Sequence, residues 1–135
     1  MKSALRTLLL SAPNVTDLVG DGVYITAVAS RPSYPYLLLT QTSADEWETL
    51  TDNGGTRRVE FDIDAKARTA GEAERLIRRV RQFLRNYTGP AGPESVQAVE
   101  ISGEASDHEP PTDGREFGVF VDTIDVAITY SPADE

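Results

Sequence analysis

Val59-Glu60-Phe61-Asp62-Ile63-Asp64-Ala65 is the stretch that decides the fold, because apolar and acidic residues alternate along it without a break. Successive side chains of a β-strand point to opposite faces of the sheet, so the apolar residues share one face and the acidic residues the other. One apolar and one polar face are typical of an antiparallel sheet that covers a core on one side only. We therefore predict a strand over residues 57–67, with Glu60, Asp62 and Asp64 facing solvent or a partner.

A long amphipathic helix is predicted directly after this strand. Thr69 and Glu72 have the spacing of a capping box, in which each side chain accepts a hydrogen bond from a backbone N–H group at the start of a helix. Gly89 and Pro90 are residues that commonly end a helix, so the helix is expected over 69–87. Its apolar positions recur at i, i+3, i+4 and i+7. They are Ala73, Leu76, Ile77, Val80, Phe83, Leu84 and Tyr87. The arginines on the opposite face are Arg75, Arg78, Arg79, Arg81 and Arg85.

The rest of the sheet is predicted from shorter β-rich segments. These segments are 23–28, 36–42, 96–102 and 117–130. Asp52-Asn53-Gly54-Gly55 is a strong turn signal, and it predicts a hairpin between 36–51 and 57–67 whose tip projects from the body. In the last segment the apolar residues occupy odd positions up to Val121 and even positions from Ile124 onwards. This change of alternation predicts a β-bulge near Asp122-Thr123. Residues 103–114 are polar and rich in Pro and Asp, so we expect a loop there.

The N-terminal leucines predict a short amphipathic helix. Arg6 interrupts the apolar run of the first ten residues, whereas a cleavable signal peptide needs about 7–15 consecutive apolar residues. Taken together, the segments predict one α+β domain over residues 1–135. It would contain a mostly antiparallel four- to five-stranded sheet, packed by the N-terminal helix and the long amphipathic helix, with a projecting β-hairpin. Residues 131–135 are expected to be a disordered tail.

The composition of the chain excludes or disfavours several classes of function. The chain has no cysteine, which excludes a disulfide framework, a thiol nucleophile and a cysteine metal site. Its formal net charge is −9, which disfavours free binding to nucleic acid, because neutralisation of phosphates supplies most of the non-specific affinity. The charge is also uneven, with acidic residues concentrated after Glu94 and arginines concentrated on the long helix. Opposite patches on one chain allow head-to-tail self-association, although solvated surface charge is the simpler interpretation.

Residues that carry catalysis are scarce. His108 is the only histidine, so general-base and triad arrangements have few candidates. The spacing of Asp62 and Asp64 is explained by strand alternation, although the two aspartates and His108 leave open a small metal-dependent enzyme. Trp47 is either a core residue or an interface anchor, since Trp is enriched at binding hot spots. We predict neither an enzyme nor a bound metal or cofactor.

The order of the elements carries a family resemblance. The residues that carry it are Pro32, Pro35, Tyr36, Leu37, Val59, Phe61, Ile63, Ala65, Ala73, Leu76, Val80, Leu84, Val126, Ile128 and Tyr130. Through the order and spacing of the elements that contain these residues, the chain resembles the tail completion, or tail terminator, proteins of long-tailed bacteriophages and of phage-derived gene transfer agents. The resemblance covers nearly the whole chain, and residues 103–116 match it least.

The resemblance implies a structural virion protein rather than an enzyme. Such a protein forms a hexameric ring that caps the tail tube, ends its polymerisation and joins the tail to the head. Its partners would be further copies of itself, the major tail tube protein and a head-completion or stopper protein. DNA would only pass through the lumen, and no membrane is involved. The expected location is the tail–neck junction of a virion, after assembly in the bacterial cytoplasm of a host that carries a phage, a prophage or a gene transfer agent.

Two sets of residues are expected at contacts. Those expected at a neighbouring subunit or the tube are Trp47, Asp52, Asn53, Arg57, Arg58, Arg75, Arg78, Arg79 and Arg85. The acidic strand face of Glu60, Asp62 and Asp64 is expected to face a partner. The alternatives are another neck or head-completion protein, an acidic monomeric interaction module and the metal-dependent enzyme described above.

Overall fold

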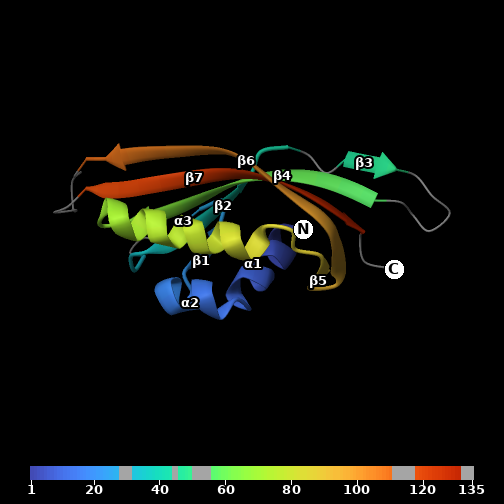
Figure 1. The fold of residues 1–135 in the computed structure, drawn as a ribbon, viewed down its shortest axis with the longest axis horizontal. Coiled ribbons are helices and arrows are strands. Elements are labelled where there is room, and N and C mark those ends of the chain that lie inside the picture. The colour runs from blue at the N-terminus through green and yellow to red at the C-terminus, as the bar shows by residue number, and fades with distance from the viewer. Residues whose placement is uncertain (28–31, 44–45, 50–55, 111–117, 132–135) are drawn as a thin grey trace.

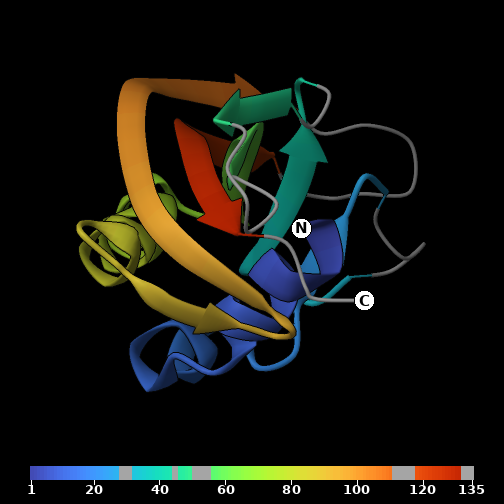
Figure 2. The same cartoon turned by 90° about the vertical axis from the view of Figure 1, so that its right-hand side faces the viewer.

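A strongly curled sheet forms the body of the protein, and helices cover one of its faces (Figures 1 and 2). The computed structural model describes residues 1–27, 32–43, 46–49, 56–110 and 118–131, and within 46–49 it describes the backbone. The described helices are α1 (Lys2–Leu10), α2 (Pro13–Val19) and α3 (Ala70–Leu84). The described strands are β1 (Val23–Ile25), β2 (Tyr36–Gln41), β3 (Glu46–Thr49), β4 (Thr56–Ala67), β5 (Gly89–Ala91), β6 (Glu94–Glu109) and β7 (Val119–Ser131).

The sheet is mixed, with one parallel pair. Its strand order is β1-β2-β4-β7-β6-β5, and β3 pairs with β4 beyond the end of β2. β1 and β2 are parallel, and the other described pairs are antiparallel. The α+β class is therefore confirmed, whereas the predicted four to five strands are too few for the seven described. β5 was not predicted, because it is short and because Gly89-Pro90 is a sequence that normally marks a turn. β3 lies within the predicted hairpin arm 36–51, which contains two strands, β2 and β3.

β4 has the predicted alternation. Val59, Phe61 and Ile63 are completely buried, and they lie opposite apolar residues of β7 in an unbroken register. The β-bulge predicted near Asp122-Thr123 is therefore wrong for this pair of strands. The apolar phase shifts along β7 because its first residues, such as Val119, are buried on the face opposite to Ile124.

α3 begins as predicted and ends earlier. The Thr69 hydroxyl accepts a hydrogen bond from the backbone N–H of Glu72 at 3.1 Å, which satisfies one of the free donors at the helix start. The apolar stripe is buried against the sheet from Ala73 to Leu84. The helix then stops at Leu84, because Arg85 is extended and Asn86 adopts a left-handed backbone conformation with φ of 60°. The predicted end at residue 87 is wrong, and Gly89 and Pro90 belong to β5.

The N-terminal segment also folds as an amphipathic helix. α1 buries Ala4, Leu5, Leu8 and Leu9 against the core, and α2 follows it after a two-residue connection. The seven residues of the second helix are too few for a clear helical period in the sequence. Within the described residues, the helices are all too short or too polar to span a membrane.

β6 is longer than predicted, and its pairing with β7 has two register shifts. It continues through residues 103–109, which were expected to form a loop, and residues 111–116 lie outside the described part of the chain. Its register against β7 shifts between Val96 and Ala98 and again between Ser102 and Glu104. The second shift leaves Gly103 as an extra residue with φ of +69°. A glycine in this conformation is typical of a β-bulge that bends a strand, and β6 bends visibly around the molecule (Figure 2).

We expect Gly103→Ala to lower the free energy of unfolding by about 1–3 kcal/mol. The positive φ strains any residue with a Cβ, and a Cβ at this position would lie 2.7 Å from Oδ2 of Asp125. Gly71→Ala is the matched control, because Gly71 lies in α3 with open space around it. This control should be neutral or stabilising by up to about 1 kcal/mol. Urea denaturation of the two variants measures the difference, and equal effects would contradict the role given to the bulge.

Candidate functional site

The sheet face turned away from the helices carries the predicted acidic residues. Glu60, Asp62 and Asp64 lie on this face of β4, because their neighbours Val59, Phe61 and Ile63 fill the core. The Thr123 hydroxyl donates a hydrogen bond to Oδ1 of Asp64 at 2.7 Å. Arg58 forms an ion pair of 2.5 Å with Glu60 and reaches Glu100 of β6 at 3.8 Å. The acidic face is thus a network of paired side chains across three strands.

Asp62 and Asp125 form a close carboxyl pair at the centre of this face. The two residues are directly opposite each other in the β4–β7 register. The side-chain hydrogen bond to Asp125, followed by burial and by repulsion from Asp125 and Asp64, raises the pKa of Asp62 from 3.8 to about 6. A hydrogen bond between two carboxyl groups needs a proton on one of them, so this contact favours the protonated form of Asp62. A hollow of about 380 Å³ lies over the pair, and Thr42, Arg58, Glu100 and Ser102 line its sides.

Asp62→Asn is expected to stabilise the protein at pH 7 by about 1 kcal/mol, after allowance for solvent screening on a partly exposed face. The folded state binds more protons than the unfolded state between pH 3.8 and about 6, because the pKa of Asp62 is raised on folding. Stability should therefore fall as the pH rises through this window, and Asn removes the fall. Urea denaturation of both proteins from pH 3.5 to 7.5 measures this difference, which should vanish at the acidic end. Asp21→Asn, at an exposed carboxyl, is the control, and a pH-independent gain for Asp62→Asn would contradict the carboxyl pair.

The sheet does not bring His108 to the two aspartates. His108 lies opposite Phe120 in β6, and Phe120 lies opposite Ala67, so its register position is on the helix-covered face. Asp62 and Asp64 are on the other face. His108 is also part of β6, and the loop predicted for it is wrong. No group of three potential metal ligands occurs among the described residues.

The arginines of α3 have different surroundings. Arg75, Arg78 and Arg85 are exposed, and Arg78 pairs with Glu74 one turn earlier at 2.6 Å. Arg79 is half-buried and donates a hydrogen bond to the backbone carbonyl of Asn14 at 3.0 Å. Arg79 therefore joins α3 to α2 within one chain, whereas Arg75, Arg78 and Arg85 are exposed at the surface of α3.

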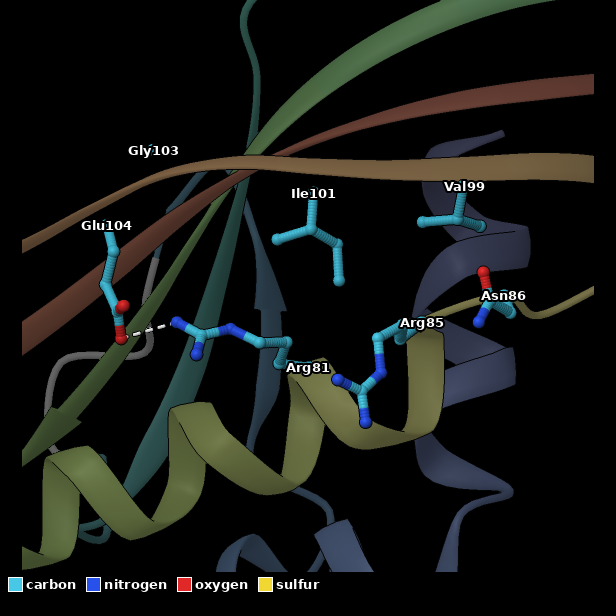
Figure 3. Close-up of a pocket in the computed structure, with 7 residues that line it drawn as sticks. All are labelled: Arg81, Arg85, Asn86, Val99, Ile101, Gly103 and Glu104. Atoms are coloured by element: carbon cyan, nitrogen blue, oxygen red, sulfur yellow. Dashed lines mark ion pairs between the residues drawn. The ribbon is translucent and has the colours of Figure 1, made fainter.

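A groove lies between α3 and β6. Its volume is about 520 Å³, and Val99 and Ile101 point into it from β6 (Figure 3). Arg81 and Arg85 approach from the helix, and Arg81 forms an ion pair of 2.5 Å with Glu104 at one end. The sequence predicted none of these β6 residues as a site, although the alternation of Val99 and Ile101 was a signal of one apolar face.

The predicted hairpin forms an arm of the sheet. β3 and the first residues of β4 extend beyond the helices (Figure 1). Their register pairs Glu46 with Arg58 and Trp47 with Arg57. Of the predicted contact residues, Asp52 and Asn53 lie outside the described part of the chain, as does the side chain of Trp47. Residues 132–135, most of the predicted tail, also lie outside it.

The chain is similar to known proteins both in its fold and in its sequence. A chain of the structure "Virion of native gene transfer agent (GTA) particle" matches with a TM-score of 0.59 and 17% identity, over 87% of this chain and 84% of its own. This likeness shows a shared fold. A second solved structure matches at 14% identity with a TM-score of 0.48, over 84% of this chain and 82% of its own. The search of curated proteins found no match. Residues 3–124 match the family described as Tail completion protein gp17. Because that match spans most of the 135 residues, the chain belongs to the tail completion protein family.

Proposed function

We propose that this chain is a structural subunit of a ring that completes a phage-type tail. The ring caps the end of the tail tube, stops the addition of tube subunits and joins the tail to the head or neck. The observation that carries this proposal is the family match over residues 3–124. The similarity of the fold to a chain of a gene transfer agent virion supports the same particle context.

The charge of the chain fits a ring through which DNA passes. Six copies, each with a formal charge of −9, would carry −54. A lumen of the same sign as the phosphate backbone lets DNA slide without binding. The acidic face of Glu60, Asp62, Asp64 and Asp125 is the surface we assign to the lumen or to its rim.

Contacts between subunits are assigned to two other regions. The exposed arginines Arg75, Arg78 and Arg85 on α3 supply positive charge against acidic neighbours. The arm of β3 and β4, with Trp47, Arg57 and Arg58, extends beyond the helices (Figure 1), and we assign it to contact with a second subunit or the tube. Asp52 and Asn53, between the two strands of the arm, are proposed for the same contact.

Electron microscopy of purified particles tests this function against its main alternative. A tag is fused to the C-terminus and located by labelling in particles from a producing cell. A tail completion ring places the label where the tube ends and meets the neck, and also on free tails that have not yet joined a head. A label found on free heads and absent from free tails would instead identify a head-completion protein.

A further inference from the structure

Among the described residues, one edge of the sheet is open along most of its longest strand, β6. β5 pairs only with Glu94–Val96 at the start of β6. From residue 97 to residue 109, no strand lies beyond β6 in the described part of the chain. Ala98, Glu100 and Ser102 are exposed along this edge. An open edge of this kind has unpaired backbone donors and acceptors, and it can bind an extended segment of another chain.

The groove described above lies directly beneath this edge. Val99 and Ile101 are half-buried and point from β6 towards α3, while Arg81 and Arg85 border the same space (Figure 3). Arg85 has no ion-pair partner among the described residues. A strand added to β6 would direct every second side chain into the groove. The groove suits an aromatic ring, because it offers aliphatic side chains for burial and guanidinium groups for cation–π contact.

The opposite edge of the sheet has a segment with the matching chemistry. β3 lies at the edge beside β4, and no strand covers its far side among the residues that the structure describes. The sequence from Asp45 to Glu48 contains three acidic residues, the only Trp of the chain and no basic residue. Carboxylates around an aromatic residue complement the arginines that border the groove.

We propose that the open edge of β6 binds β3 of a second copy of this chain, with Trp47 of that copy in the groove between β6 and α3. The inference rests on the proposed function, since it names the contact that builds the ring. β3 is antiparallel to β4, β4 to β7, and β7 to β6, so β3 runs antiparallel to β6. A sheet that continues from copy to copy keeps this direction. The contact joins two different edges, so it is heterologous, and it closes into a ring when repeated by rotation.

The absence of cysteine allows a direct test by disulfide formation. Glu46→Cys is combined in turn with Ala98→Cys, Glu100→Cys or Ser102→Cys in the full chain. Within one copy, β3 and β6 are separated by β4 and β7, a distance of about 14 Å that no disulfide spans. A bond between them must therefore join two copies. The control is Glu46→Cys with Gln82→Cys, since Gln82 is exposed on α3.

The variants are oxidised both as purified protein and inside assembled particles, and then run on non-reducing gels. We expect at least one β6 partner to give a ladder of covalent oligomers, because each copy carries one cysteine at either edge, and we expect the control to remain monomeric. Trp47→Ala should weaken self-association roughly 30-fold by light scattering, whereas Trp47→Phe should retain most of it. If no β6 position gives a ladder while the label stays at the end of the tail, this contact is wrong and the proposed function stands. If the label is absent from tails, the proposed function itself fails.

Discussion

Phe61→Ala is expected to lower the free energy of unfolding by about 3–5 kcal/mol, because it leaves a cavity in the centre of the core. Phe61 has no exposed surface. It lies on β4 opposite Gln41 of β2 and Val126 of β7, and its side chain belongs to the hydrophobic core cluster. A domain of this size is stable by about 5–15 kcal/mol, and the substitution removes a large part of that.

Phe83→Ala is the matched control for this prediction. Phe83 is only half-buried on α3, where its ring lies 5.7 Å from the ring of Tyr87. Truncation there should cost less than half as much, since water already reaches the side chain. Urea denaturation followed by circular dichroism compares the two variants at pH 7. Equal losses of stability would mean that β4 is not the centre of the core.

The elements whose apolar residues repeat regularly within one continuous segment could be predicted from the sequence. β4 and α3 are the clearest, because Val59, Phe61 and Ile63 alternate, and the residues from Ala73 to Leu84 follow one helical face. Each buries enough apolar surface on one side to make its pattern visible. The capping role of Thr69 was predictable for the same reason, since it depends on residues within one turn of the chain.

The elements fixed by distant partners could not be predicted in this way. Residues 103–109 have the composition of a loop, and they form a strand only because β7 pairs with them. The bulge at Gly103 lies on β6, although the apolar phase shift that suggested a bulge is on β7. Sheet pairing joins residues far apart in sequence, and no local pattern of β6 encodes its register against β7.

The candidate surfaces also differ in how far the sequence predicts them. The acidic face of β4 followed from alternation alone. Its chemistry depends on Asp125, which is 63 positions from Asp62 in the sequence and becomes its neighbour only through the β4–β7 register. The groove beneath β6 was missed altogether, because it needs a helix and a strand edge to meet. Arg81 was expected on a free helix face, and it is instead paired with Glu104.

Removal of this chain from a producing cell should give the largest functional effect. In the proposed function, identical tube subunits add head to tail, and a heterologous contact of that kind has no intrinsic end. Without a terminating ring, the tubes should grow beyond their normal length, and they should not join heads. Transfer of DNA by the particles should be lost. Wild-type protein supplied from a second gene copy should restore normal particles, and Phe61→Ala protein should restore fewer because less of it is folded.

The distribution of tail lengths in particles from such cells, measured by electron microscopy, tests the central claim most directly. The account predicts a broad distribution that extends past the wild-type length, with free heads beside unjoined tails. Supplying the wild-type chain should return the tails to a single length and rejoin them to heads. Tails of normal length that merely lack heads would point to a head-completion protein, and normal joined particles would contradict a role in tail completion altogether.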